Sequence, residues 1–302
     1  MNRQRDFIYI SLNSKLKQGE MKMETLEELQ GWYCFKYAKE KELADGTIET
    51  YYSTLEKFKN FFGPDYKIKD LSGKDLTRFK NNSNGKTNTI KQNLDILKTA
   101  ILEGLKKKKL DIKFSHWLDR NPFNEITLAQ SKKPKTRVLS ESEEALIYQY
   151  APAFIKPIIT IALCTGLRVS DILSLKWSMI NRDSWVINIV NKKTGIELIQ
   201  PIIGPAREEI KNLEMDHQYL FPELSRNAVS MAFKRCVDKS QIKKLRFHDL
   251  RHTFCSRLAM GNVPLVEIAE LAGHTNIQTT RRYSHLLTKN KKKALETLER
   301  NN

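Results

Sequence analysis

The sequence has few cysteines and lacks a long hydrophobic run. Its four cysteines lie far apart and form no C-x-x-C pair, which excludes a disulfide framework or cysteine zinc site and predicts reduced core thiols. The longest apolar stretch, residues 157–164, is far shorter than the roughly 20 residues that a membrane span requires. Residues 1–10 contain too brief an apolar run for a secretory signal. We therefore expect no membrane association and a cytoplasmic location.

Acidic residues are too few to balance the basic ones. The 52 lysines and arginines exceed the 35 acidic residues and give a formal net charge of +17. Such an excess attracts polyanions through counterion release. A membrane binder concentrates its charge on one amphipathic helix, whereas here basic residues recur along the chain. Nucleic acid is the expected partner, and a hydrophobic content of 40% argues for folded domains over a basic disordered tail.

The length of 302 residues and the hydrophobic patterning predict two domains. Residues 26–37, 47–62 and 90–105 have amphipathic helical spacing and predict a small helical bundle. A polar, basic segment then interrupts the pattern. The predicted parts are an N-terminal extension (1–22), a helical domain (23–129), a basic linker (130–137) and a second domain (138–302).

Basic side chains gather before and within this linker. A solvated connection explains such a run, and so does a strap across a DNA backbone. The candidate DNA-binding residues here are Lys106, Lys107, Lys108, Lys109, Lys132, Lys133, Lys135 and Arg137.

The second domain combines helices with one hairpin. Ser140 and Glu143 form a capping-box pattern that predicts the start of a helix. Residues 185–190 and 196–203 are β-rich runs that flank a lysine-bearing turn and predict a β-hairpin. Further helices are expected over residues 227–237, 247–260 and 264–272. The fold class is therefore mainly α with a small β-sheet in the C-terminal domain.

Two motifs carry candidate phosphate-binding groups. Gly166 ends an apolar helix, and Arg168 and Asp171 fall three residues apart at the start of the next one, which is equally the pattern of a surface ion pair. His248 and Arg251 share one helical face, so a proton-transfer group lies beside a phosphate clamp. His248 and His252 also have the spacing of a metal pair, but no third ligand is evident.

A third motif places His274 at a turn after Gly273, with Tyr283 nine residues later. An alternative interpretation is a helix-turn-helix, with residues 266–273 as the first helix and turn. Residues 278–282, including Arg281 and Arg282, would then read DNA bases.

Together these motifs resemble the tyrosine recombinase family, also called phage integrases. The family's C-terminal domain carries Arg, Lys, His-x-x-Arg, His or Trp, and Tyr in this order. The matching residues are Arg168, Lys193, His248, Arg251, His274 and Tyr283. The motifs cover residues 165–285, and the N-terminal bundle resembles the family's helical core-binding domain in position, size and helicity.

The resemblance implies covalent DNA strand exchange without ATP or metal. Two arginines would clamp the scissile phosphate, His274 would add a hydrogen bond, and Tyr283 would attack and form a 3′-phosphotyrosyl bond. His248 and the cationic surroundings would help Tyr283 lose its proton, and Lys193 on the hairpin would protonate the leaving 5′-oxygen. Asp171 would support its helix.

The implied protein is a site-specific recombinase or integrase acting on double-stranded DNA. The expected assembly is a homotetramer on paired sites, with accessory DNA-bending or directionality factors, in a bacterial or phage-encoded setting at the nucleoid. Alternatives are type IB topoisomerase-like DNA relaxation and a non-catalytic helix-turn-helix regulator. The apolar stripe of Ala294, Leu295 and Leu298 in the tail would pack on its own domain or in a neighbouring protomer.

Overall fold

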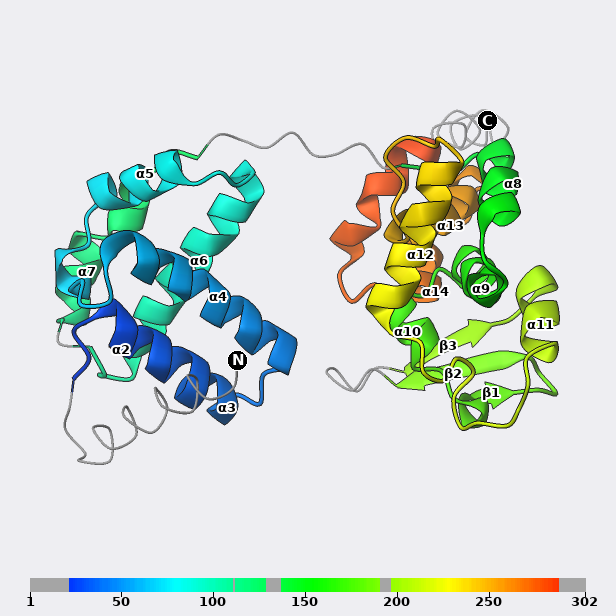
Figure 1. Ribbon diagram of the computed structural model, residues 1–302, viewed down its shortest axis with the longest axis horizontal. Coiled ribbons are helices and arrows are strands. Elements are labelled where there is room, and N and C mark those ends of the chain that lie inside the picture. The colour runs from blue at the N-terminus through cyan, green and yellow to red at the C-terminus, as the bar shows by residue number, and fades with distance from the viewer. Residues whose placement is uncertain (1–21, 111, 129–136, 191–196, 288–302) are drawn as a thin grey trace, which may run out of the picture. The chain divides into compact units, whose positions relative to one another are not determined.

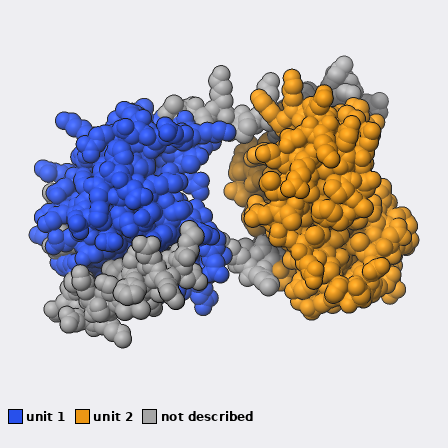
Figure 2. All heavy atoms as spheres, in the orientation of Figure 1, with its two compact units in different colours: residues 1–133 blue, residues 134–302 orange. Residues whose placement is uncertain are grey.

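The computed structural model describes residues 22–110, 112–128, 137–190 and 197–287. It divides into two compact units, residues 1–133 and 134–302, which Figure 2 shows in different colours. Most of the predicted extension and linker, the hairpin turn with Lys193, and the tail lie outside the described residues. Within the described ranges, no helix is both long and apolar enough to cross a membrane.

Unit 1 is a bundle of helices (Figure 1). The first begins at a capping box in which Thr25 and Glu28 satisfy each other's backbone amides. Its elements are α2 (Leu26–Gly31), the π-helix η1 (Trp32–Tyr37), α3 (Ala38–Glu40), α4 (Asp45–Phe62), the 3₁₀ turn η2 (Ile68–Asp70), α5 (Gly73–Asn82), α6 (Thr87–Lys106), α7 (Phe114–Asp119) and the 3₁₀ turn η3 (Pro122–Glu125). Leu29, Phe58 and Leu97 are fully buried where these helices meet.

The three helical stretches predicted in this unit are confirmed, and α5 is an addition. Leu76 and Phe79 are the only large apolar residues of α5, and both are buried, so the sequence has few apolar positions from which to predict this helix. A capping box between Ser72 and Asp75 begins this helix. Lys106 ends α6 and Lys107 caps it, so this lysine run belongs to the bundle.

Unit 2 is mostly helical, with a small sheet at one side (Figure 1). Its helices are α8 (Glu141–Tyr150), α9 (Lys156–Thr165), α10 (Val169–Leu173), α11 (Gly204–Lys211), α12 (Arg226–Lys239), α13 (His248–Met260) and α14 (Leu265–Ala272). The 3₁₀ segments are η4 (Ala153–Ile155), η5 (Trp177–Met179), η6 (Ile277–Thr279) and η7 (Arg281–Leu287). The strands are β1 (Ile180–Asn181), β2 (Val186–Val190) and β3 (Glu197–Pro201).

The sheet is antiparallel in the order β1-β2-β3. Ile187 pairs with Ile180 on one side and with Gln200 on the other, and all three side chains are buried. The predicted hairpin strands are confirmed, as is the capping box of Ser140 with Glu143 at α8. The fold class predicted from the sequence is therefore confirmed.

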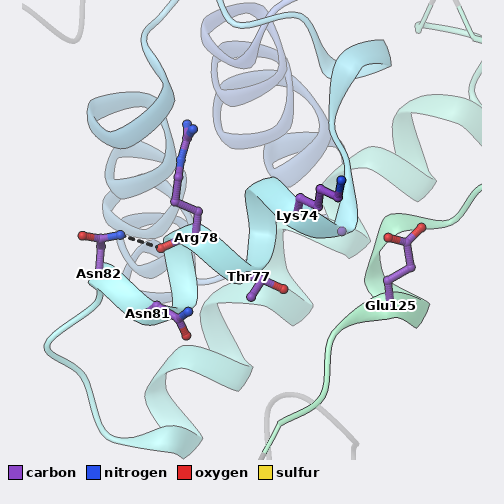
Figure 3. A pocket seen from close by; sticks show the side chains of 7 residues that line it. Lys74, Thr77, Arg78, Asn81, Asn82 and Glu125 are labelled. Carbon is purple, nitrogen blue, oxygen red and sulfur yellow. Dashed lines mark hydrogen bonds between the residues drawn. The ribbon is translucent and has the colours of Figure 1, made fainter.

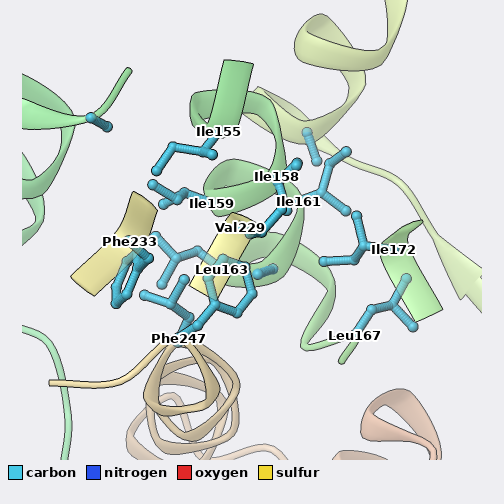
Figure 4. Close-up of a cluster of buried hydrophobic side chains, with 14 of the residues drawn as sticks. Ile155, Ile158, Ile159, Ile161, Leu163, Leu167, Ile172, Val229, Phe233 and Phe247 are labelled. Carbon is cyan, nitrogen blue, oxygen red and sulfur yellow. The ribbon is translucent and has the colours of Figure 1, made fainter. Parts of the chain in front are cut away.

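The main core of unit 2 surrounds α9. Ile158, Ile159 and Ile161 are 0% exposed, and Figure 4 shows Ile159 on the side of α9 toward Phe233 of α12 and Ile161 on the side toward Ile172 of α10. A helix apolar on every side is typical of a core element. Because α9 is fixed in this way, the turn at its end and the neighbouring α13 have defined positions.

A second, smaller core packs α13 against α14 and η7. Its buried members are Phe254, Cys255, Ala259, Ile268, Ala272 and Tyr283. The segment with Tyr283 is thus held by apolar packing. This packing joins the end of the described chain to the helix that bears His248 and Arg251.

Candidate functional site

The turn after α9 brings the first arginine to the site. Gly166 ends the helix with φ +68°, and a Cβ there would lie 2.3 Å from Cδ1 of Phe254, so both the conformation and the close packing require glycine. The chain then enters α10 with Arg168 as its N-cap. Nη1 of Arg168 lies 3.6 Å from Oδ2 of Asp171, so the ion pair and the helix break predicted from the sequence are both present.

Arg251 lies inside the site and is only partly satisfied. Its side chain is 3% exposed, and Nη1 donates a 2.7 Å hydrogen bond to the carbonyl of Gly166. Nη2 is buried and has no hydrogen-bond partner among the described residues. Burial, together with the charge of Arg168, lowers the pKa of Arg251 to about 10. A buried guanidinium with an unused donor is prepared for an anion.

The start of α13 is anchored by Asp249. Its carboxylate is nearly fully buried. It accepts hydrogen bonds from the backbone N of Arg246 at 2.7 Å and from Nη2 of the same arginine at 3.0 Å. A carboxylate at this position also suits the positive end of the helix dipole. His248 lies directly before it, and burial and the charge of Arg251 lower the pKa of this imidazole.

His274 follows Gly273, which ends α14 in the left-handed conformation as the sequence predicted. Thr280 Oγ1 lies 2.7 Å from Nδ1 of His274 in a hydrogen bond. Burial lowers the pKa of His274 to about 4, and the charges of Arg251 and Arg168 act in the same direction. The structure therefore brings these two arginines and His274 into one electrostatic environment, with His274 neutral at pH 7.

Tyr283 is 1% exposed, and its hydroxyl lies 2.6 Å from Nδ1 of His252. The sequence pointed to His248 as the proton acceptor, whereas the observed partner is His252. Burial raises the pKa of Tyr283, and the neighbouring thiol of Cys255 raises it further. Arg282 and Arg251 lower it but are outweighed. The expected activation by surrounding cations therefore does not dominate.

Three side chains of the site were not predicted in these roles: His252, Cys255 and Thr280. His252 directly follows Arg251, and Cys255 follows one helical turn later, so both share the helix of the His-x-x-Arg motif. That helical spacing was the available signal. The sequence held no such signal for Thr280, because its contact with His274 depends on the path of the chain between Asn276 and Tyr283.

Other predicted residues lie outside this cluster or outside the described part of the chain. The residues outside the described part of the chain are Lys132, Lys133, Lys135 and Lys193. Lys106 pairs with Glu103 at 2.7 Å, and Arg137 donates to Glu143 beside the α8 cap. Arg281 and Arg282 are exposed, with Nη1 of Arg281 donating to Gln278 at 3.1 Å.

The helix-turn-helix alternative requires an α-helix after Gly273. The chain instead forms the 3₁₀ segments η6 and η7. The proposed base-reading residues therefore lie on no recognition helix.

Unit 1 carries a polar hollow of about 460 Å³ on α5. Figure 3 shows Lys74, Thr77, Arg78, Asn81 and Asn82 along one side of the hollow and Glu125 on the other. Its lining contains cationic and amide groups but no histidine, cysteine or tyrosine, so the candidate nucleophile lies elsewhere.

Comparisons with known proteins identify the family and the fold. A model of the phage integrase family matches residues 135–290, and one of the phage integrase SAM-like domain matches residues 31–125. The integrase of Salmonella phage P22 is 28% identical over 191 residues, covering 56% of this chain and 48% of that protein. The tyrosine recombinase XerC of Staphylococcus epidermidis is 22% identical over 289 residues, covering 86% of this chain and 93% of that protein.

A solved lambda integrase dimer bound to a COC′ core site has the same fold. Its TM-score is 0.71 at 21% identity, with 90% of this chain and 80% of that chain covered. The chain spans about half the length of the P22 integrase, which is first among the curated relatives.

Proposed function

The chain belongs to the phage integrase family, and from this premise we propose that it is a site-specific DNA recombinase that cleaves and rejoins duplex DNA through a 3′-phosphotyrosyl intermediate. The observation that carries the proposal is the unpaired, buried Nη2 of Arg251 in the same cluster as His274 and Tyr283. A group that binds an anion, a hydrogen-bond donor and a nucleophile belong together in phosphoryl transfer.

The scissile phosphate is the anion in this proposal. Arg168 and Arg251 pair with its non-bridging oxygens and stabilise the charge of the pentavalent transition state. If the hydroxyl of Thr280 donates to Nδ1 of His274, the single ring proton is on Nε2, which can donate to a phosphate oxygen.

The reaction exchanges one phosphodiester for another. Oη of Tyr283 forms a bond to phosphorus, the bond to the 5′-oxygen breaks, and Lys193 supplies the proton to that leaving group. The phenolic proton leaves Tyr283 during attack, and His248 stays the proposed acceptor. A 5′-hydroxyl from another strand then reverses the step. The bond energy is conserved, so ATP is not needed, and Arg168, Arg251 and Lys193 supply the charge neutralisation in place of a metal ion.

Double-stranded DNA is the proposed partner, and the net charge of +17 supports it. A homotetramer on paired sites is the proposed assembly, by analogy with a lambda integrase tetramer solved on a Holliday junction. Accessory DNA-bending or directionality factors belong to the same proposal. The recombinase acts in the cytoplasm, at the nucleoid.

The test is the Tyr283→Phe variant. Because only the nucleophilic oxygen is removed, we expect normal duplex binding and no protein–DNA adduct that survives detergent. Wild-type protein should form the adduct in the presence of EDTA. An adduct formed by Tyr283→Phe would refute the proposal, relaxation of supercoiled plasmid without recombination would indicate a topoisomerase, and binding without any adduct by the wild type would indicate a regulator.

A further inference from the structure

Two groups of α13 hold the hydroxyl of Tyr283. Nδ1 of His252 lies 2.6 Å from Oη, and the thiol of Cys255 also makes a hydrogen bond to it. His252 is 9% exposed and Cys255 is 0% exposed, so both contacts are shielded from water. Neither residue is among the six that match the family's catalytic residues, yet both touch the proposed nucleophile.

The hydrogens of the three groups fit one arrangement. Burial raises the pKa of Cys255, so the thiol keeps its hydrogen and stays uncharged. Burial lowers the pKa of His252 to about 4, so the ring is neutral at pH 7 and has one nitrogen free to accept. The phenol can therefore donate its single hydrogen to Nδ1.

The same values indicate what His252 does not do. The pKa of about 4 at His252 lies far below that of Tyr283, which burial raises above its ordinary 10.0. Transfer of the proton from Tyr283 to His252 is therefore unfavourable in this arrangement. His252 accepts a hydrogen bond and leaves the proton on the phenol.

We propose that His252 is a positioning residue for strand cleavage, which fixes Oη of Tyr283 relative to the phosphate clamp by accepting its hydrogen bond. This inference rests on the proposed recombinase function. His252 adjoins Arg251 on α13, so one rigid helix sets both the phosphate-binding guanidinium and the nucleophile's oxygen. A misplacement of about 1 Å in such a pair lowers rates by about a hundredfold.

Three variants separate this role from general destabilisation. His252→Phe keeps a planar ring but removes the acceptor, whereas His252→Asn places a carbonyl oxygen close to the position of Nδ1. Ser256→Ala is the matched control, because Ser256 is a buried polar residue of the same helix whose Oγ has no hydrogen-bond partner among the described residues. Thermal unfolding of each full-length variant measures the structural cost.

The DNA probe is obtained with the protein itself. Tyr283→Phe selects a binding sequence from a random duplex library, and this sequence is then prepared with a nick beside the cleavage position so that the adduct accumulates. Single-turnover adduct formation at saturating DNA measures the cleavage rate, and a separate titration measures the Kd. A positioning defect changes the rate but leaves the Kd within about twofold.

We expect His252→Phe to form the adduct ten- to a hundredfold more slowly than wild type, His252→Asn to recover most of the rate, and Ser256→Ala to equal wild type. If His252→Phe does not fold, His252→Gln takes its place, since its longer side chain carries the amide past the position of Nδ1, and it should be slower than His252→Asn. A wild-type or faster rate for His252→Phe would overturn the proposal. So would His252→Asn being as slow as His252→Phe.

The outcomes also distinguish this inference from the proposed function. If wild-type protein forms no adduct on the selected duplex, the recombinase proposal fails. If wild type forms the adduct, Tyr283→Phe does not, and His252→Phe reacts at the wild-type rate, only the positioning role fails.

Discussion

Loss of water sets the ionisation of the site residues. Burial is the largest influence on Arg251, His252, His274 and Tyr283, and it favours the uncharged form of each. In Arg251 the charge persists at neutral pH, because its pKa is still about 10. Arg251 thus keeps its positive charge inside a buried site, and an incoming phosphate would neutralise that charge.

The buried histidines should make the folded protein acid-sensitive. His252 and His274 have pKa values of about 4 when folded, below the 6.5 of an ordinary histidine. Between these values the unfolded chain binds more protons, so the stabilisation is complete above pH 6.5 and is lost as the pH falls toward 4. The slope is at most about 1.4 kcal/mol per pH unit for each group. Melting temperatures measured from pH 7.5 to 4.5 should fall accordingly.

The double variant His252→Asn/His274→Asn is the control for this pH dependence. It lacks both titrating rings, so its melting temperature should decline less steeply than that of wild type. Equal slopes for the two proteins would show that other groups cause the acid sensitivity.

Lys193 is the remaining proposed catalytic side chain. It lies outside the described residues, and a chemical test of its role does not depend on where it lies. Lys193→Ala should fail on an ordinary duplex, because the 5′-oxygen leaves without a proton. It should recover on a duplex whose leaving oxygen is replaced by sulfur, since a thiolate needs no proton. Adduct formation on the two duplexes measures this. If Lys192→Ala shows this pattern instead, the adjacent lysine is the general acid.

Among the elements, the turn between α9 and α10 connects the main core to the site. Its carbonyl at Gly166 accepts from Arg251, and its Cα faces the ring of Phe254 on α13. Neither contact leaves space for a side chain. The turn thus sets the spacing of α9 and α13 and the position of Arg168 together.

Gly166→Ala should therefore destabilise unit 2 by about 2 kcal/mol or more, through the left-handed backbone and the clash with Phe254. Gly204→Ala is a matched control in the same unit, because Gly204 also has positive φ but a Cβ added there would meet nothing within 4 Å. Urea unfolding of the full chain measures both. Equal losses of stability would show that the contact with Phe254 contributes nothing.

Elements with strong local signals were predictable from the sequence. The apolar α9, its terminal glycine, the capping box of α8 and the β-hairpin strands each follow from a short pattern, and each is present. The helix α5 buries only two apolar side chains, so its pattern was too sparse to indicate it. The 3₁₀ segments after Gly273 depend on packing against α13, which no local pattern encodes.

The site was predictable to the same extent. The spacing of the motifs indicated Arg168, Arg251, His274 and Tyr283, and the structure places the first three in one electrostatic environment. The partner of Tyr283 was not predictable, because the choice between His248 and His252 depends on how η7 packs across α13. Contacts between segments that are distant in sequence determine which histidine Tyr283 meets.

On the scale of the whole molecule, each unit has its own hydrophobic core. The chain that carries these cores has a net charge of +17. Such a protein suits a partner with a continuous negative surface, and duplex DNA has one. Assembly on paired sites then requires contacts between protomers that the separate cores do not supply.

The tail from Lys289 to Arg300 is the segment that we expect to supply the contacts between protomers. Truncation after Thr288 should leave half-site binding by the monomer largely intact but weaken assembly on paired sites and alter cleavage. Some affinity should be lost in any case, because the tail lysines neutralise phosphates. Native gels of half-site and paired-site complexes across a salt series measure both effects.

Two full-length variants separate the apolar stripe of the tail from its charge. Leu295→Ser with Leu298→Ser keeps the lysines and should reproduce the assembly defect, because the narrow stripe needs a partner surface to fold against. Replacing Lys289 and Lys291 to Lys293 by glutamine keeps the stripe and should instead weaken half-site and paired-site binding alike, with a shallower dependence on salt. If truncation itself weakens the two complexes equally, the tail acts only within its own subunit, and the protomers must be joined through another surface.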